Sequence, residues 1–71
     1  MQKHQITQYN MNIGRAFKLL KPLGPMRRGE IVSCFAEEKD YIWLFLPRDW
    51  CGARQVKLSK KLARELLEDT Y

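Results

Sequence analysis

Apolar and polar residues alternate in short runs along most of the chain, up to about residue 58. Alternation over about four to eight residues is the pattern of a strand with one buried face. In the run that contains Phe17 and Leu19, those two side chains share a face and Lys18 lies on the other. The pattern predicts strands at residues 7–13, 15–21, 30–35, 41–46 and 53–58.

One of these runs, Tyr41 to Leu46, contains only apolar residues. A period of two therefore cannot assign a solvent-facing side, and we expect a central strand covered on both faces. The strand would place Tyr41, Trp43 and Phe45 on one side and Ile42, Leu44 and Leu46 on the other. Because a single helix covers only one face of a small sheet, the second face requires a curled barrel, a twofold dimer or a larger protein partner.

The period changes after Ser59, which is a good helix N-cap. Leu62, Ala63, Leu66 and Leu67 then form one apolar stripe at helical spacing, which predicts a helix over residues 60–68. Its first turns are basic and its end is acidic, the reverse of what the helix dipole favours. We therefore expect the packing of Leu62 and Leu66 to hold this helix on the sheet.

The segments between these elements have the composition of turns. Residues 22–29 carry two prolines and two glycines, residues 47–52 form a second predicted loop, and residues 37–40 form a polar tip. Residues 1–5 are polar and are expected to be a disordered terminus. The sequence thus predicts one small domain that is mainly β (α+β), an antiparallel meander of four to five strands with one C-terminal helix.

The run of short strands, with a Gly/Pro-rich loop before Gly29-Glu-Ile-Val, resembles the small SH3-like barrels over about residues 14–58. Such barrels usually end in a further strand where this pattern predicts the helix, so either a barrel or an open sheet is compatible with it. The resemblance implies an adaptor that binds nucleic acid or a protein segment. Such barrels are mainly adaptors rather than enzymes. A fold by itself does not assign a function, so the side chains have to indicate it.

The amino-acid composition indicates the kind of partner and the compartment to expect for this domain. Among 71 residues, 13 Lys and Arg against 8 Asp and Glu give a formal net charge of +5, which favours polyanionic partners. No apolar run is long enough for a membrane span, and the polar start lacks the apolar centre of a signal peptide. We therefore expect a cytoplasmic protein with no membrane partner, in which Cys34 and Cys51 are free thiols.

The chain is poor in groups for catalysis or metal binding. His4 is the single histidine and lies in the terminal segment, far along the sequence from either cysteine. Neither cysteine belongs to a Cys-x-x-Cys pair, and a tetrahedral metal site would be incomplete. The acidic residues at 37–40 are typical of a solvated turn. The sequence therefore predicts a protein that is not an enzyme, with no metal and no cofactor.

Positive charge beside an aromatic side chain is the feature that best indicates a function. The predicted binding residues are Arg27, Arg28, Arg48, Trp50, Arg54 and Lys57, and Lys60, Lys61 and Arg64 extend the basic surface onto the helix. Basic side chains would contact the phosphates of DNA or RNA, and Trp50 would either stack on an unpaired base or cover the end of the core. The alternative is a protein-interaction or assembly module, such as a small regulatory subunit, inhibitor or homodimer, that uses the apolar face of strand 41–46.

Overall fold

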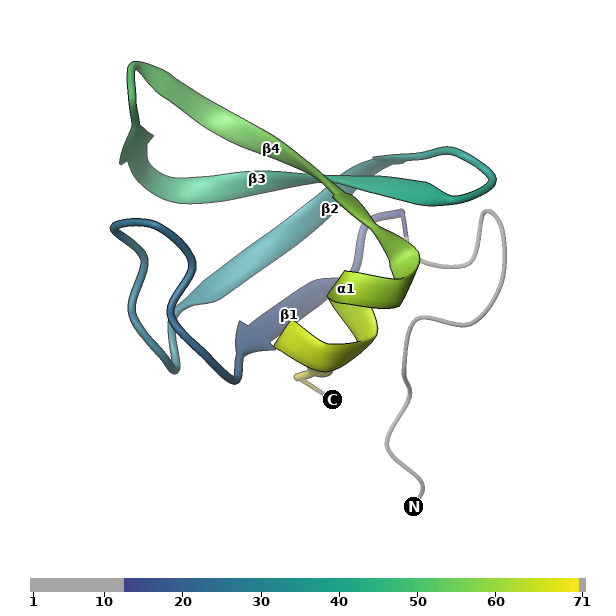
Figure 1. Cartoon of the computed structure of the whole chain (residues 1–71), viewed down its shortest axis with the longest axis horizontal. Coiled ribbons are helices and arrows are strands. Elements are labelled where there is room, and N and C mark those ends of the chain that lie inside the picture. Colours follow the sequence, from purple (N-terminus) through teal and green to yellow (C-terminus); the bar gives the residue numbers. More distant parts are fainter. Residues whose placement is uncertain (1–12, 71) are drawn as a thin grey trace.

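A computed structural model describes residues 13–70 of the chain. These residues form one antiparallel sheet with strand order β4-β3-β2-β1-β5 and one helix that precedes the last strand (Figure 1). The elements are β1 (Ala16–Leu19), β2 (Ile31–Glu37), β3 (Tyr41–Trp50), β4 (Ala53–Ser59), α1 (Lys60–Leu66) and β5 (Leu67–Asp69). The predicted fold class, a small mainly β meander with one helix, is confirmed.

The predicted strands at 15–21, 30–35 and 53–58 correspond to β1, β2 and β4. Of the candidate strand at 7–13 only Ile13 is described, and it lies in a turn. The rest of that candidate, the predicted disordered terminus and His4 lie outside the described residues. The fifth strand is instead β5, and between residues 13 and 70 the sheet stays open at β4 rather than closing into a barrel.

Strand β3 is longer than predicted and replaces most of the expected loop at 47–52. It continues to Trp50, and the connection to β4 is a two-residue turn in which Cys51 has a φ of 54° and Gly52 a φ of 84°. Two successive positive φ values are typical of type I′ turns, whose twist matches that of the paired strands. Pro47 is tolerated inside β3 because the β3–β4 register is irregular between Phe45 and Trp50.

Helix α1 begins as predicted but ends two residues early. The Ser59 hydroxyl accepts a hydrogen bond from the Leu62 amide at 3.1 Å, which confirms the N-cap. Residues Leu67–Asp69 leave the helix to pair with β1, so that Leu67 lies opposite Leu19. Leu62, predicted to pack on the sheet, is 42% exposed. Within the described residues no helix has the length and apolar character needed to cross a membrane.

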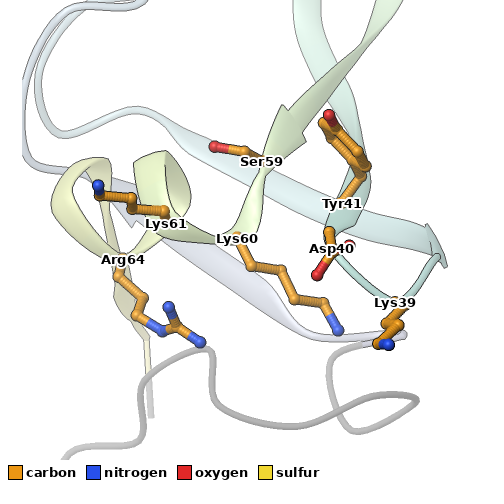
Figure 2. Close-up of a pocket in the computed structure, with 7 residues that line it drawn as sticks. All are labelled: Lys39, Asp40, Tyr41, Ser59, Lys60, Lys61 and Arg64. Carbon is orange, nitrogen blue, oxygen red and sulfur yellow. The ribbon is translucent and has the colours of Figure 1, made fainter.

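Lys60 was predicted to extend the basic surface and is instead buried. Its Nζ lies 2.6 Å from an Oε of Glu37, and only 7% and 0% of the two side chains are exposed. Figure 2 shows the Lys60 side chain extending from the start of α1 toward the β2–β3 turn. A buried charge requires such a partner, since water no longer solvates it. The first helical residue is therefore part of the structural interior.

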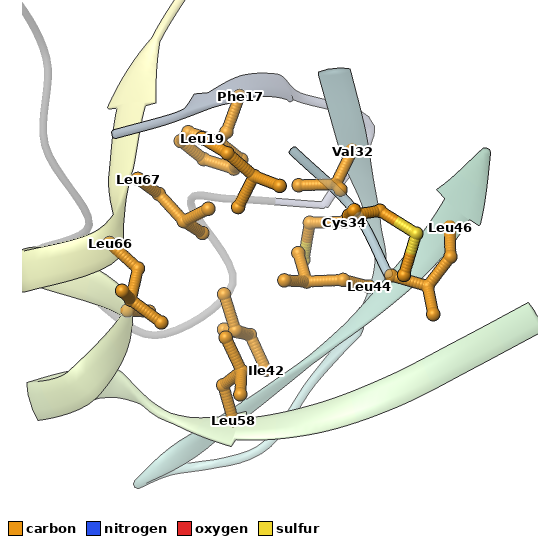
Figure 3. Packing of buried hydrophobic residues seen from close by; sticks show 12 residues of the cluster. Phe17, Leu19, Val32, Cys34, Ile42, Leu44, Leu46, Leu58, Leu66 and Leu67 are labelled. Carbon is orange, nitrogen blue, oxygen red and sulfur yellow. The ribbon is translucent and has the colours of Figure 1, made fainter. Parts of the chain in front are cut away.

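The core lies on one side of the sheet, under α1 and the loop after β1. The sheet contributes Phe17, Leu19, Val32, Cys34, Ile42, Leu44, Leu46, Leu58 and Leu67, and Met26, Ala63 and Leu66 complete the cluster (Figure 3). Within the described residues only the inner face of strand 41–46 is covered, since Tyr41 and Phe45 are 41% and 49% exposed on the outer face. A curled barrel therefore does not cover the outer face, and its covering by a dimer or a protein partner stays a prediction. One short helix covers only the inner face, and the open sheet does not curl over the outer one.

Candidate nucleic-acid interface

The two predicted basic loops lie together at one end of the sheet. The Arg48 side chain in β3 donates a hydrogen bond to the carbonyl of Pro25 at 2.9 Å and forms an ion pair with Glu30. The Arg27 amide donates to the same Glu30 carboxylate at 2.6 Å. These contacts hold residues 25–30 against the end of β3, so Arg27, Arg28 and Arg48 lie near one another. The side chains of Arg27 and Arg28 are exposed there.

Trp50 covers the end of the core, which is the second of the two roles predicted for it. It is half-buried and packs against the hydrophobic core. Its ring also lies directly against Gly24, because a Cβ added to that glycine would be 2.4 Å from Cε2 of Trp50. Trp50 therefore holds the loop after β1 against the end of β3. The aromatic side chains that are open to solvent belong to another surface of the sheet.

The outer face of β2 and β3 carries a group of aromatic side chains, of which Phe35, Tyr41 and Phe45 are exposed and Trp43 is half-buried. We call the surface formed by Phe35, Tyr41, Trp43 and Phe45 the outer aromatic face. Tyr41, Trp43 and Phe45 point outward because they alternate with buried residues along β3. Phe35 joins them where the β2–β3 register shifts between Cys34 and Ala36, and its ring centroid lies 6.4 Å from that of Trp43.

Two of the predicted basic residues lie over these rings. The Nζ of Lys57 is 4.6 Å from the ring centroid of Tyr41 and 5.6 Å from that of Trp43. The guanidinium of Arg54 is 5.2 Å from the ring centroid of Phe45, and it also donates to the carbonyls of Leu46 and Pro47 at 3.2 and 3.0 Å. The outer aromatic face thus has two cations over its rings, of which Arg54 also lies 3.9 Å from an Oδ of Asp49.

Trp43 is held in a defined orientation on this face. Its indole Nε1 donates a hydrogen bond to an Oε of Glu38 at 3.1 Å, and its ring is flanked by Phe35 and Lys57. Because the indole has one donor and Glu38 satisfies it, the ring presents mainly its π surface. A flat ring held in this way is suited to stack against another planar group.

A basic pocket lies at the Tyr41 end of the outer aromatic face (Figure 2). It has a volume of about 290 Å³ and is lined by residues from the β2–β3 turn, the start of β3 and α1. Lys39, Lys60, Lys61 and Arg64 contribute positive charge, and Asp40 contributes a negative one. The predicted arginines of the loops lie at the other end of the sheet, so basic groups stand at both ends of the aromatic row.

Sequence reasoning found the cations of this surface and missed its rings. Lys57 and Arg54 were predicted binding residues, whereas Tyr41, Trp43 and Phe45 were assigned to a covered face. The signal was present in the sequence: outward positions of the neighbouring run 53–58 carry Gln55 and Lys57, which a buried face would not accommodate. Pairing β3 with β4 makes that polar pattern the outer side of both strands.

The two cysteines differ in environment. Cys34 is buried in the core, and Cys51 is exposed in the β3–β4 turn, and both are free. Burial raises the pKa of the Cys34 thiol, with the nearby Glu37 charge acting in the same direction. Cys34 therefore remains a protonated, poorly nucleophilic thiol at neutral pH. Among residues 13–70 there is no group of three or more His, Cys, Asp or Glu side chains that could hold a metal ion.

Thiol labelling should separate the two cysteines. With an aromatic disulfide reagent at neutral pH, we expect one equivalent of thiol to react quickly in the native protein and the second only after denaturation, because the reagent needs an accessible thiolate. A Cys51→Ser variant should lose the fast phase and keep the slow one. Two equally fast thiols in the native protein would contradict the burial of Cys34.

Comparison with protein-family models, with curated proteins and with solved structures found no match to this chain.

Proposed function

We propose that this chain is a non-enzymatic module that binds single-stranded nucleic acid, DNA or RNA, on the outer aromatic face. The observation that carries the proposal is the placement of Lys57 and Arg54 over the exposed rings of Tyr41 and Phe45. Proteins that bind single strands combine aromatic platforms for the bases with basic groups along the backbone. A duplex hides the faces of its bases, so this surface is suited to unpaired strands.

The cations over the rings do not prevent a base from stacking there. An exposed cation–π contact contributes about 0.5–1 kcal/mol, whereas stacking of one base on an aromatic side chain contributes about 1–3 kcal/mol. An incoming base can therefore displace the flexible Lys57 from Tyr41 with a net gain. The released ammonium then lies close to the sugar-phosphate backbone of the same nucleotide.

The basic loop predicted at residues 22–29 lies at the Phe45 end of the sheet but on the side of the core, since Met26 is buried in the core and Gly24 lies against Trp50. It offers a second basic area beside the outer aromatic face. Arg27 and Arg28 are exposed, and Arg48 is held beside them by Glu30. Glu30 offsets part of the charge of Arg48, so Arg27 and Arg28 are the stronger candidates for phosphate contacts. Trp50 contributes indirectly, since it holds the loop in place rather than offering an open ring.

An SH3-like assignment is supported by the path of the chain. Strands β2, β3 and β4 form a meander, and β5 follows a short helix and returns to pair with β1. That return supplies the final strand that such folds have and that the sequence pattern did not reveal. We infer an SH3-like module with an open sheet, which fits an adaptor role; the binding proposal itself rests on the side chains of the outer face.

A direct test is titration of labelled single-stranded DNA, single-stranded RNA and a duplex, followed by fluorescence anisotropy at about 50 and about 200 mM salt. We expect single strands to bind more tightly than the duplex, and the affinity to fall with salt because bound cations release counterions. Equal affinity at both salt concentrations, or no binding at the lower one, would reject the proposal.

Substitution of Trp43 tests the role of the rings. We expect Trp43→Leu to weaken single-strand binding by about 5- to 150-fold, the loss that corresponds to one stacked base. Trp43→Phe keeps a ring at the same position and should retain most of the affinity. Thermal unfolding of both variants controls for stability. Equal affinity of the leucine and phenylalanine variants would show that stacking at this position is not used.

A protein-interaction or assembly role is the second candidate. It is favoured by the apolar side of the same surface, where Ile31 and Phe35 are as exposed as Phe45. Large exposed apolar patches often mark protein interfaces. This reading predicts a homodimer, or a complex with a specific protein, that survives moderate salt because apolar burial holds it. Sedimentation of the purified chain distinguishes it: a salt-insensitive dimer that excludes oligonucleotides would favour this role.

A further inference from the structure

Strand β4 forms one margin of the sheet and, among the described residues, pairs with β3 alone (Figure 1). It has seven residues, whereas β5 at the opposite margin has three. Ala53, Arg54, Gln55 and Lys57 are exposed, and Val56 is half-buried against the core. A long and accessible edge strand is a template on which another strand can pair.

The register of β3 and β4 shows which backbone groups of this edge are open. The amide of Lys60 donates to the carbonyl of Asp40 at 2.8 Å, and these two residues continue the β3–β4 register. Hydrogen-bonded pairs alternate with non-hydrogen-bonded pairs in an antiparallel ladder, so counting by two from Lys60 makes Val56 a residue that bonds to β3. The amides and carbonyls of Gln55 and Lys57 therefore point away from β3, toward the edge.

The charged side chains of β4 are directed away from these backbone groups. The Nζ of Lys57 lies 4.6 Å from the ring centroid of Tyr41, and Arg54 donates to the carbonyls of Leu46 and Pro47, so both side chains lean back across β3. Charged residues on an edge strand usually keep other strands away. Here the charge is turned toward the neighbouring strand of the same chain, which leaves the backbone of the edge accessible.

We propose that a second copy of this chain pairs with β4, antiparallel and about a twofold axis at Val56, so that two sheets join edge to edge. In this register Gln55 exchanges backbone hydrogen bonds with Lys57 of the second copy, and the symmetric pair does the same on the other side of the axis. Lys57 then lies opposite an uncharged amide side chain. Val56 meets Val56 of the second copy on the core side of the sheet and loses its remaining exposure to water.

The other registers that align the open backbone groups are less favourable. A register centred on Lys57 places two ammonium groups directly opposite each other, and like charges in that position destabilise a strand pair. A register centred on Gln55 places Arg54 opposite Val56 instead of a second apolar side chain. Only the axis at Val56 pairs both an apolar residue with an apolar one and each lysine with an uncharged group.

This dimer differs from one that would form through the outer aromatic face. The twofold axis is perpendicular to the joined sheet, so both outer aromatic faces lie on the same side of it and stay open. A face-to-face dimer would cover Tyr41 and Phe45 instead. The edge-to-edge inference therefore does not depend on what the outer aromatic face binds.

Proline substitution at the edge tests the pairing. Gln55→Pro removes an amide that does not bond to β3, and proline is tolerated on an edge strand at such positions. Sedimentation of the wild-type chain should approach twice the mass of one chain as its concentration rises. Gln55→Pro should dimerise at least about tenfold more weakly, because each chain loses a hydrogen bond across the axis. Gln55→Ala keeps the amide and should dimerise like the wild type, and thermal unfolding compares the stability of the two variants.

A disulfide across the axis tests the register and does not depend on the stability of the proline variant. In a Cys51→Ser background, Val56→Cys would meet its counterpart at a Cα separation of about 4.5 Å, which a disulfide can span. We expect oxidised glutathione to convert this variant rapidly to a covalent dimer. Gln55→Cys in the same background lies opposite Lys57 of the second copy and should cross-link more slowly.

A wild-type chain that stays monomeric at every concentration would overturn the proposal. Equal dimerisation of folded Gln55→Pro and Gln55→Ala, or equal cross-linking of the two cysteine variants, would do so as well. Loss of the dimer in Trp43→Leu, with Gln55→Pro unaffected, would also overturn it, since the interface would then be the outer aromatic face. None of these measurements uses an oligonucleotide, so their outcome is independent of the proposed function.

Discussion

Replacing Lys60 with methionine is expected to lower the free energy of unfolding by about 3–5 kcal/mol. The substitution keeps most of the side-chain volume and removes the ammonium that lies 2.6 Å from Glu37. The Glu37 side chain is fully buried, so its carboxylate would lose a charge partner that water cannot replace. A domain of this length has a total stability of roughly 3–5 kcal/mol, and we therefore expect the variant to be largely unfolded at room temperature.

The neighbouring residue supplies a matched control. Lys61→Met makes the same change in charge and volume at the next helical position, but Lys61 is exposed. Its effect should stay within about 0.5 kcal/mol, as for most surface substitutions. Urea unfolding followed by tryptophan fluorescence and circular dichroism measures both variants.

A double variant separates loss of the pair from loss of packing. In Lys60→Met combined with Glu37→Leu, both charges are replaced by apolar groups, and such replacements of buried ion pairs are often neutral or stabilising. We expect the double variant to regain most of the stability lost in Lys60→Met. A single variant as stable as the wild type would contradict the burial of this ion pair.

Most of the strands could be predicted because their patterns were local. In β1, Phe17 and Leu19 alternate with exposed neighbours, and in β4 Leu58 and Lys57 do the same, so a period of two assigned both strands and their inner faces. Ser59 marked the start of α1 through its hydroxyl, which is also a local signal. The bounds of β1, β2 and β4 and the start of α1, which depend on nearby residues, were therefore predicted to within two residues.

The end of α1 could not be predicted because it depends on a distant strand. Leu66 and Leu67 fit both a helical stripe and a strand. What decides between them is the edge of β1, which is about 50 residues away in the sequence and needs hydrogen-bond partners. The amide of Leu20 donates to the carbonyl of Leu66 at 2.7 Å, so pairing with β1 begins where the helix ends. Only the tertiary structure contains this information.

The candidate site was predicted in part for a related reason. Its cations were found from charge and position, and two of them, Arg54 and Lys57, lie on the outer face. Its rings were missed because an uninterrupted apolar run carries no sign of which side is solvated. Lys60 shows the opposite error, because it was assigned to the surface and is buried. Nothing in the sequence near Lys60 indicates that its side chain pairs with the buried Glu37.

The second large effect is expected at Gly24. We expect Gly24→Ala to lower the free energy of unfolding by about 2–5 kcal/mol, the sum of two costs. Gly24 has a φ of +57°, a conformation that costs a residue with a Cβ about 1–2 kcal/mol. The added Cβ would also lie 2.4 Å from Cε2 of Trp50, and overpacking of this kind costs about 1–3 kcal/mol.

Gly52→Ala isolates the first of these costs. Gly52 also has a positive φ, of +84°, but an added Cβ would have no neighbour within 4 Å. We expect this variant to lose only the backbone contribution, about 1–2 kcal/mol, and to keep the native tryptophan emission. In Gly24→Ala the Trp50 ring must move away from the loop, so the emission should also shift toward that of a more exposed indole. Equal losses in the two variants, with unchanged emission in both, would show that Trp50 does not hold residues 22–29 onto the end of β3.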